Sequence, residues 1–424
     1  MAIIKEFPIH EGLRDLSPYI PIVGEQKVEE LIRLAEDLRG VRLQQINSAR
    51  KGGGVAEMLQ SVIPLERSLG LDVSWEVVTG PQQFFLYTKT LHNFLQGKDG
   101  LPDILGAKFY WDTNAANYHL VDEDAEVVLI HDPQPAGLIE FAPPEVRARQ
   151  KWLWRCHIQL SQDHHKYMTD FLRPLIEKYD TVICSSSRFL PPWAAEFTVI
   201  LPYIDPLSDK NRELAEDEIQ SVLDTYGIED PKSKPLITLI SRFDPFKGHT
   251  YAIDAFLKVH DKMPCQLLLA GGTASDDPEN ERIFAELQGK TEGMPDIHLL
   301  NLPPDSHKEI NAFQRASAVI LQPSLKEGFG LTVSEGMWKE KPVIGGDTGG
   351  IPAQITDGYN GFLVPPGKKG VELMAERIAY ILTHPKIAQE MGKRAKETVR
   401  ERYLITRGIW DELSTIKQLL RPVS

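Results

Sequence analysis

Short runs of apolar residues alternate with longer segments in which apolar residues recur every three or four positions, from about residue 40 onward. Short apolar runs bounded by turn residues predict buried parallel strands, and the longer segments predict the helices that connect them. In the first half, strands are predicted at 41–47, 73–78, 126–133, 152–158, 181–186 and 197–202, with a helix at 54–70. This series indicates one doubly wound α/β domain.

A polar, proline-containing stretch at 201–218 interrupts the alternation, and a second series follows it. Its predicted strands lie at 236–243, 265–272, 318–324, 342–346 and 361–366, with helices at 251–263 and 307–317. We therefore predict an α/β protein of two Rossmann-like doubly wound domains, 1–205 and 206–404, with a helix at about 405–424 packing back on the first. The two domains are expected to face each other across a cleft, because open α/β sheets bind ligands beyond the carboxyl ends of their strands.

Charge and cysteine usage narrow the class of protein. The 424 residues suffice for two or three domains, and their formal charge of −13 does not favour a nucleic-acid or membrane partner. Any anionic ligand must then be held by a few placed cations or by backbone N–H groups. Three widely spaced cysteines suit neither a zinc ribbon nor a disulfide framework, so buried thiols are expected. Without a recognisable leader or membrane span, the chain is expected in the cytoplasm.

The loop "SRFDPFKGHT" follows a predicted strand and carries Arg242 and Lys247 ahead of a helix. A guanidinium fork and a lysine point charge beside a helix N-terminus suit a diphosphate. The alternative for the loop alone is two ordinary surface cations.

The segment "EGFGLTVSE" sets Glu327 in a turn after a buried strand and Glu335 about one turn into the following helix. At the turn, the Glu327 carboxylate is expected to face the first free N–H groups of the helix. A carboxylate can accept two hydrogen bonds from neighbouring hydroxyls, and a sugar nucleotide offers one such diol on its sugar and one on its ribose. The alternatives are a helix-capping acid for Glu327 and a solvated helix face for Glu335.

Two glycine-rich turns follow strands, "VIGGDTGGIPAQI" with Gly349 and Gly350, and "SARKGGGVAEM" with Gly53 and Gly54. Glycines let backbone N–H groups approach phosphates or hydroxyls closely. The spacing of a dinucleotide fingerprint is absent, so NAD is not expected.

Polar groups after first-domain strands are candidates to meet a polyol. They comprise His131, Asp132 and Gln134 in "HDPQPAG", Arg155, His157 and Gln159 in "WRCHIQLS", and Lys89, His92, Asn93 and Gln96 on one predicted helical face. Structural histidines and a solvated polar stripe are the alternatives. No metal site is expected, because no H-E-x-x-H or cysteine ligand spacing occurs. No G-x-S-x-G elbow offers a serine nucleophile.

These motifs together resemble the retaining GT-B glycosyltransferases, whose hallmark is two glutamates separated by seven residues. "EGFGLTVSE", "SRFDPFKG" and "GGIPAQI" carry the resemblance in the second half. "INSARKGGGVAEML", "TKTLHNFLQG", "HDPQPAGLIEF" and "WLWRCHI" look like the trehalose-forming branch, which contains trehalose glycosyltransferring synthase and trehalose phosphorylase. The resemblance spans about residues 40–405.

The resemblance implies reversible transfer of glucose from a nucleoside-diphosphate glucose to free glucose, giving α,α-trehalose with retention. ADP-, UDP- and GDP-glucose are candidate donors, no tightly bound cofactor or metal is expected, Mg²⁺ is a candidate stimulator, and a homodimer is a candidate assembly. Alternatives are a trehalose phosphorylase, a GT-B transferase with another acceptor, a same-fold nucleotide-sugar epimerase, and a non-catalytic nucleotide-sugar sensor. The shorter chain favours the synthase over the phosphorylase.

The resemblance also implies roles for residues. The catalytic residues would be Arg242, Lys247, Glu327 and His157. The donor-binding residues would be Gly53, Gly54, Arg242, Lys247, Glu327, Gly328, Phe329, Gly330, Leu331, Glu335, Gly349 and Gly350. The acceptor-binding residues would be Lys89, His92, Asn93, Gln96, Asp132, Gln134, Arg155, His157 and Gln159. Gln159 departs from the family, where an aspartate is expected, so the acceptor is the least determined partner.

Overall fold

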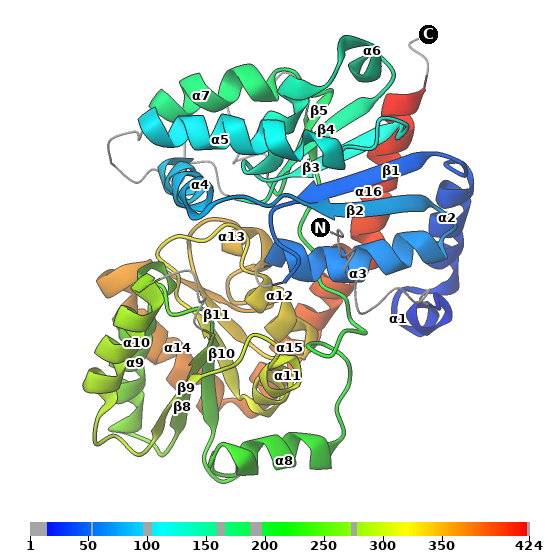
Figure 1. Cartoon of the computed structure of the whole chain (residues 1–424). Helices are drawn as coiled ribbons and strands as arrows, with labels where there is room; N and C mark the ends of the chain where they lie inside the picture. Colours follow the sequence, from blue (N-terminus) through cyan, green and yellow to red (C-terminus); the bar gives the residue numbers. More distant parts are fainter. Residues whose placement is uncertain are drawn as a thin grey trace. The chain divides into compact units, whose positions relative to one another are not determined.

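The computed structural model describes residues 15–51, 54–95, 104–158, 166–186, 197–272 and 278–421. The chain divides into two compact units, the first comprising Met1–Pro202 with Ile405–Ser424 and the second Tyr203–Leu404. Within the described residues each unit contains one six-stranded parallel sheet with helices around it (Figure 1). The predicted α/β class with two doubly wound domains is confirmed.

The first unit is built on a sheet with the strand order β2-β1-β3-β4-β5-β6. Its strands are β1 Arg42–Asn47, β2 Asp72–Val77, β3 Val127–His131, β4 Lys151–Cys156, β5 Thr181–Cys184 and β6 Phe197–Val199. Its helices are η1 Ser17–Tyr19, α1 Ile20–Val23, α2 Glu25–Glu36, α3 Gly54–Ser68, α4 Gln82–Leu95, α5 Ile104–Asn117, η2 Tyr118–Leu120, η3 Pro135–Phe141, α6 Pro144–Arg147, α7 Lys166–Ile176 and α16 Ile405–Leu420.

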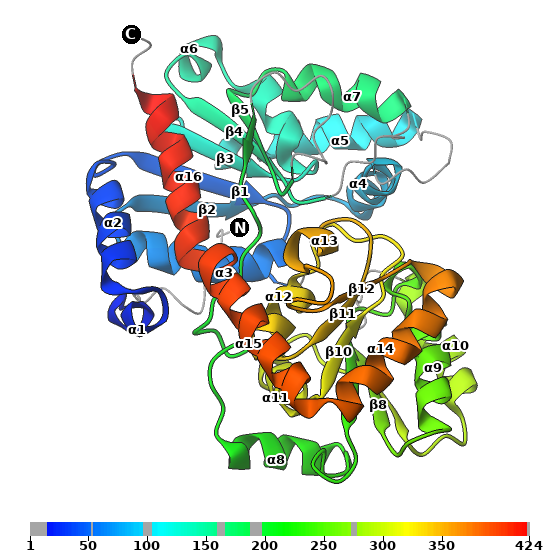
Figure 2. The same cartoon turned by 180° about the vertical axis from the view of Figure 1, so that it is seen from behind.

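The two faces of this sheet differ in chemistry because successive side chains of a strand point to opposite sides. Ile46, Ile130 and Trp154 lie in one apolar cluster with residues of α4, α5, η3 and α7. Their neighbours Gln45 and Arg155 point the other way, toward α3 and α16. Figure 2 shows α16, in red, with α2 on its side of the sheet.

The second unit has the strand order β12-β11-β10-β7-β8-β9. Its strands are β7 Leu236–Ile240, β8 Gln266–Gly271, β9 Ile297–Asn301, β10 Val319–Gln322, β11 Val343–Gly346 and β12 Phe362–Val364. Its helices are α8 Glu216–Thr225, η5 Pro245–Lys247, α9 His249–His260, α10 Pro278–Thr291, α11 His307–Ala316, α12 Leu331–Trp338, α13 Ile351–Gln354, η6 Gly367–Gly370, α14 Val371–Thr383 and α15 Pro385–Arg402.

Both faces of the second sheet are apolar. Ile237 and Leu239 pack with α9 and α14 on one face. Leu236 and Ile240 pack with α8 and α11 on the other. A strand buried on both faces needs a continuous apolar run, which is why "LITLI" is a strand of this sheet.

The fold tests the sequence expectation for the cysteines. The three cysteines are free and buried, as predicted. Strand β9 was not predicted, because its residues after Ile297 are half-buried or exposed and the run is not typical of a core strand. No helix in the described ranges combines the length and hydrophobicity that a membrane crossing requires.

Candidate active site

Three loops of the second unit meet at one edge of its sheet. β7, β10 and β11 are neighbours in the parallel sheet, so the loops that leave their carboxyl ends lie side by side. These loops carry the cationic motif at 241–248, the glutamate motif at 323–330 and the glycine motif at 347–350. The fold therefore brings together the donor-binding motifs predicted for this half of the chain.

The first two loops pack backbone against backbone. The N–H of Leu325 donates to the carbonyl oxygen of Phe246 at 2.7 Å. Gly248 has φ +77, and a Cβ there would lie 2.2 Å from the carbonyl oxygen of Pro323. Only glycine fits this backbone conformation and this approach. Gly248 thus fixes where Lys247 stands relative to the glutamate loop.

Lys247 and Glu327 are joined by an ion pair. The Lys247 Nζ lies 2.8 Å from Glu327 Oε2, and the two side chains are only 18% and 10% exposed. The same oxygen also accepts from Ser324 Oγ at 3.1 Å and from Gln322 Nε2 at 3.3 Å. The alternative that Glu327 caps the helix is wrong, because α12 begins later, with Gly330 at its N-cap and no side-chain cap.

Arg242 stands on the same loop as Lys247 and is more open to solvent. Its side chain is 52% exposed, and its guanidinium lies 3.9 Å from Asp244. Asp244 caps η5 by accepting from the N–H of Phe246 at 2.7 Å. The short capped helix orders the loop between the two predicted phosphate-binding cations.

Glu335 is buried, with 7% exposure, so the alternative of a solvated helix face is wrong. Lys210 Nζ lies 3.8 Å from its carboxylate. Lys339, one turn further along, donates to the backbone oxygen of Glu335 at 3.2 Å and to Asn211 Oδ1 at 3.0 Å. Burial, in spite of the nearby Glu335 carboxylate, lowers the pKa of Lys339 to about 7. A half-buried lysine nitrogen thus faces the side chain of Glu335, and a buried one bonds to its backbone oxygen.

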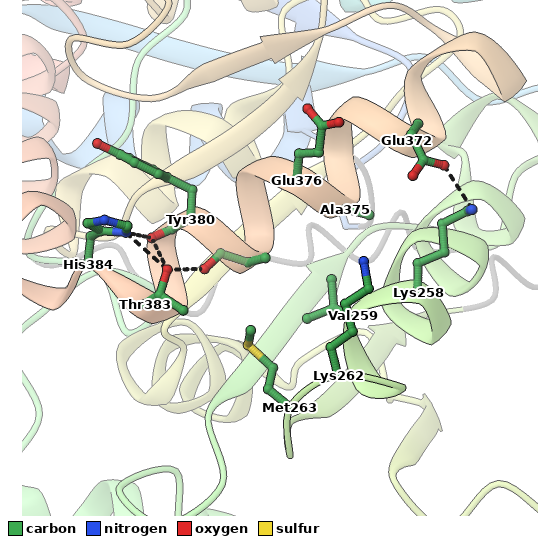
Figure 3. A pocket seen from close by; sticks show the side chains of 11 residues that line it. Lys258, Val259, Lys262, Met263, Glu372, Ala375, Glu376, Tyr380, Thr383 and His384 are labelled. Atoms are coloured by element: carbon green, nitrogen blue, oxygen red, sulfur yellow. Dashed lines mark hydrogen bonds and ion pairs between the residues drawn. The ribbon is translucent and has the colours of Figure 1, made fainter.

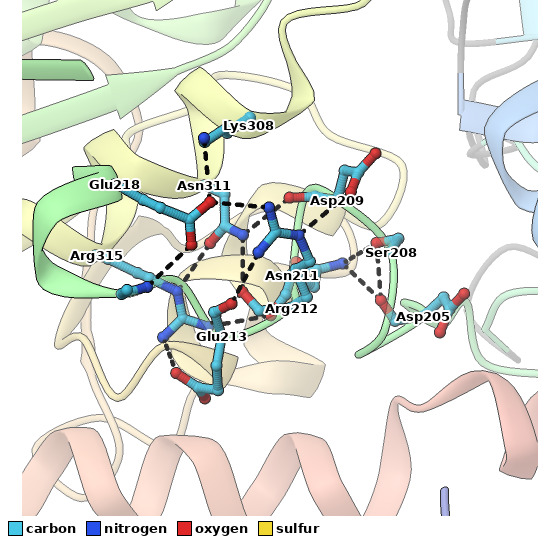
Figure 4. Close-up of polar contacts among 11 residues, drawn as sticks. Asp205, Ser208, Asp209, Asn211, Arg212, Glu213, Glu218, Lys308, Asn311 and Arg315 are labelled. Atoms are coloured by element: carbon cyan, nitrogen blue, oxygen red, sulfur yellow. Dashed lines mark hydrogen bonds and ion pairs between the residues drawn. The ribbon is translucent and has the colours of Figure 1, made fainter. Parts of the chain in front are cut away.

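A network of polar contacts holds the segment that carries Lys210 (Figure 4). Asn311 Nδ2 donates to the backbone oxygens of Asp209 and Arg212, at 2.9 and 2.8 Å. Arg315 adds bonds to the backbone oxygens of Asn211 and Arg212, at 3.1 and 2.9 Å. The stretch that interrupts the apolar pattern in the sequence is therefore anchored to α11.

The glycine loop closes against the glutamate loop. The N–H of Gly350 donates to the carbonyl oxygen of Gly328 at 2.9 Å, and a Cβ at Gly350 would lie 2.7 Å from that oxygen. Gly349, at φ +58, precedes it. The Gly350 N–H is thus engaged within the protein, which leaves the Gly349 N–H as the remaining donor-binding candidate of the pair.

Phe329 and Leu331 frame the start of α12. Phe329 is buried against Tyr403, with ring centroids 5.4 Å apart, and its backbone oxygen accepts from Gln354 Nε2 at 2.6 Å. Leu331 is half-buried at the first position of the helix. These contacts fix the backbone between the two predicted sugar- and ribose-binding carboxylates.

In the first unit the ends of β3 and β4 bring His131 and His157 together. His131 Nδ1 lies 2.9 Å from His157 Nε2, and the rings are nearly parallel at 16°. His131 is fully buried, whereas His157 is half-buried. Burial, together with the charge of Arg155, lowers the pKa of both imidazoles well below the ordinary value.

Asp132 joins the two histidine segments from a strained backbone position. Its φ of +66 is uncommon for a residue other than glycine. The Asp132 carboxylate accepts from the N–H of His157 at 2.8 Å, and its backbone oxygen accepts from Trp154 Nε1 at 2.9 Å. Burial raises the pKa of Asp132 to about 6. Strain of this kind persists where the surroundings over-determine it, as at a binding site.

Arg155, a predicted acceptor-binding residue, forms a buried ion pair. Its guanidinium lies 2.6 Å from Glu412 Oε2 of α16, with the two side chains 3% and 1% exposed. The described contacts therefore assign Arg155 to the joint between β4 and α16. Direct acceptor binding by Arg155 stays a prediction.

The other predicted residues of the first unit are spread over α3, α4 and the loop after β3. Lys89 is exposed, whereas His92, Asn93 and Gln134 are half-buried. Gly54 is the first residue of α3. Gly53, Gln96 and Gln159 lie outside the described residues. Among the described residues, no group of three His, Cys, Asp or Glu side chains is placed to hold a metal ion.

Sequence reasoning missed Lys210, Lys339, Gln322 and Ser324, which contact the two glutamates. Lys210 sits in a segment that the pattern marks only as an interruption, and Gln322 ends a strand as an isolated polar residue.

A groove of about 350 Å³ lies elsewhere in the second unit, between α9 and α14 (Figure 3). Its Lys258 and Lys262 are at the opposite end of α9 from Lys247, so the groove is separate from the site.

Comparisons with known proteins identify the family of the chain. Residues 45–191 match the family "Trehalose synthase, N-terminal domain", and residues 227–398 match "Glycosyl transferases group 1". The chain is 44% identical over 422 residues to "Trehalose synthase" of Pyrococcus horikoshii, covering 98% of this chain and 99% of that one. It is 30% identical over 403 residues to "Trehalose phosphorylase" of Pleurotus pulmonarius, covering 83% of this chain but 54% of that protein.

Among solved structures, the sucrose-phosphate synthase from Thermosynechococcus elongatus has a TM-score of 0.69 at 16% identity, covering 89% of this chain and 99% of that one. Two parallel α/β units, with a cationic loop and a paired-glutamate loop at the same sheet edge, define a glycosyltransferase of the GT-B class. The predicted class and enzyme type are confirmed. The near full-length likeness goes further, and the chain belongs to the trehalose synthase family.

Proposed function

We propose that this protein is a trehalose synthase, which transfers glucose from a nucleoside-diphosphate glucose to the anomeric hydroxyl of free glucose, reversibly and with retention. The observation that carries the proposal is the identity to a trehalose synthase over 98% of the chain. The meeting of Lys247 and Glu327 at the edge of the second sheet supports it, because cation and carboxylate suit the phosphate and the hexose of such a donor.

Each group of the second unit has a task in this reaction. Arg242 and Lys247 bind the diphosphate and stabilise its charge as the C1–O bond to the phosphate breaks. Lys247 carries three protons, so it can keep its bond to Glu327 while it donates to a phosphate oxygen. Glu327 accepts from hydroxyls of the donor glucose. Glu335 accepts from the ribose, and Lys210 orients its carboxylate.

The contacts of Glu327 favour a reaction in which this carboxylate is not the nucleophile. A retaining hydrolase places a nucleophilic carboxylate beside the anomeric carbon, whereas Glu327 is tied to Lys247, Ser324 and Gln322. We propose attack from the face that the phosphate leaves. The acceptor oxygen then forms the new bond to C1, and its proton passes to the departing phosphate oxygen.

Polar residues of the first unit are proposed to bind the acceptor. Asp132 and His157 are the candidates, because one bond joins them and both follow strands at the same sheet edge. The nucleotide base, any stimulation by Mg²⁺, a homodimeric assembly and a cytoplasmic location stay predictions from the sequence.

The activity is tested in both directions with the full chain. Glucose is incubated with ADP-, UDP- or GDP-glucose, and trehalose is incubated with ADP, UDP, GDP or inorganic phosphate. We expect trehalose with at least one donor and a nucleotide-glucose in reverse, with only α,α product by NMR. Glucose 1-phosphate formed from phosphate alone would identify a phosphorylase. Donor binding without turnover would identify a sensor and overturn the proposal.

A further inference from the structure

A chain of buried hydrogen bonds runs from α3 and α16 to His157 through the first sheet. Gln45 Nε2 donates to Glu66 Oε2 at 2.9 Å and to Glu412 Oε1 at 3.2 Å. Gln45 Oε1 lies 2.9 Å from His131 Nε2, and His131 Nδ1 lies 2.9 Å from His157 Nε2. Gln45, Glu66, His131 and Glu412 are each at most 1% exposed, so this chain is shielded from water.

Glu66 and Glu412, at one end of this series of hydrogen bonds, determine the direction of each bond in it. One of the two amide atoms of the Gln45 side chain faces a carboxyl oxygen of each of these acids. Burial raises the pKa of both acids, most of all that of Glu66, while the charge of Arg155 opposes the shift at Glu412. The ion pair of 2.6 Å between Arg155 and Glu412 needs an ionised Glu412, so the two acids hold at most one shared proton between them. Only an NH₂ group carries two protons for two such acceptors. The amide nitrogen of Gln45 therefore faces the acids, and its oxygen faces His131.

The imidazole protons follow from this orientation. The Gln45 oxygen can only accept, so His131 carries its proton on Nε2. Burial lowers the pKa of His131, which keeps the ring neutral and its Nδ1 unprotonated. Nδ1 must then accept from a proton on His157 Nε2. His157 is neutral for the same reason, which leaves its Nδ1 with a free lone pair.

We propose that Gln45, His131 and Glu412 are positioning residues that hold His157 as its Nε2–H tautomer, so that Nδ1 accepts a hydrogen bond from a hydroxyl of the bound sugar. That the ligand is a sugar rests on the proposed function. His157 Nδ1 has no hydrogen-bond partner within the described part of the chain, and the ring is half-buried. The opposite tautomer would present an N–H, which recognises a different set of hydroxyl orientations.

The tautomer is measured directly by NMR. The whole chain is labelled with ¹⁵N-histidine, and two-bond ¹H–¹⁵N spectra are recorded without sugar, with a His157→Gln sample used only to assign the ring. We expect a protonated Nε2 and an unprotonated Nδ1 in His157, and the same pattern in His131. A protonated Nδ1 in His157 overturns the proposal, and this result requires no variant to fold.

The relay is then tested with Gln45→Met and with Gln44→Met as a matched control. Gln44 precedes Gln45 in β1 and is also buried, with 2% exposure. Its side chain donates to the backbone oxygen of Leu120 and accepts from the N–H of Asp122, so Gln44→Met also removes two buried hydrogen bonds. Gln45→Met should shift His157 toward a mixture of tautomers, while Gln44→Met should leave its spectrum unchanged. Unchanged His157 signals in Gln45→Met would contradict the relay.

The consequence for the sugar is read from kinetics. Gln45→Met should raise the KM for glucose about tenfold more than Gln44→Met, the scale of one weakened hydrogen bond. Equal KM values for the two variants, with the predicted tautomer present, overturn the role of Nδ1 while leaving trehalose synthesis by the wild type intact. A wild type that makes no trehalose but shows the tautomer refutes the proposed function and upholds the positioning chain.

Discussion

Lys247 and Glu327 are 80 residues apart in sequence and meet at 2.8 Å. One comes from the loop after β7 and the other from the loop after β10, and both side chains are largely shielded from solvent. Removing one partner of such a pair leaves the other charge in a partly desolvated place. The pair therefore joins the two loops, and its two groups are those proposed to bind the phosphate and the hexose of the donor.

Lys247→Ala should lower kcat about a hundredfold, the scale for loss of one preorganised charge that stabilises a transition state. Lys258→Ala is the matched control, because Lys258 pairs with exposed Glu372 near the far end of the helix that follows Lys247. Initial rates of trehalose formation give kcat, and thermal unfolding checks the fold. A Lys247→Ala enzyme that turns over as fast as the control would refute the phosphate-binding role.

Glu335→Gln should weaken binding of the nucleoside diphosphate about tenfold, because an amide in place of the carboxylate can accept only one of two ribose hydrogen bonds. Titration calorimetry with ADP or UDP measures the affinity. Glu376→Gln on the surface of α14 serves as the control and should bind like the wild type. Equal affinities of the two variants would rule out the ribose contact.

Periodicity was enough to find most of the sheet strands, since buried parallel strands are written as apolar runs. "LITLI" and "AVILQPS" predicted β7 and β10 to within a few residues. Strand β9 escaped because an edge strand needs no continuous apolar run. The placement of Lys247 and Glu327 at one sheet edge followed from the same rule, because both loops leave carboxyl ends of parallel strands.

The supporting contacts could not be predicted from the sequence. Lys210 lies 3.8 Å from Glu335, in a segment to which Asn311 and Arg315 of a helix distant in sequence are hydrogen-bonded. The pairing of Arg155 with Glu412 joins residues 257 positions apart, and neither neighbouring sequence indicates the other. Such contacts depend on which faces of the elements meet, and periodicity assigns only which face is apolar.

Gly248→Ala should destabilise the second unit by about 3 kcal/mol, because it combines a left-handed backbone with a clash against Pro323. Gly227→Ala separates the two causes. Gly227 has φ +66 with no atom within 4 Å of an added Cβ, so it should cost only about 1 kcal/mol. Urea unfolding measures both. Equal losses would show that the backbone conformation, rather than the contact between the two loops, sets the cost.

His249 should make the stability of the second unit depend on pH. It is 3% exposed, its Nε2 lies 3.0 Å from Ser241 Oγ, and burial lowers its pKa to about 4. Between the ordinary value near 6.5 and about 4, the unfolded chain binds a proton that the folded chain does not. This contribution to stability is therefore complete above pH 6.5 and is lost as the pH falls toward 4.

Over that window, His249 should account for about 2–3 kcal/mol of the wild type's loss of unfolding free energy. His249→Gln keeps a polar group beside Ser241 but cannot titrate. Between pH 7 and pH 4.5, its unfolding free energy should therefore fall by about 2–3 kcal/mol less than that of the wild type. His384→Gln, which replaces an exposed histidine after α14, should keep the full wild-type slope. Urea unfolding at a series of pH values gives the three curves, and parallel curves for the wild type and His249→Gln would show that His249 is not the source of the slope.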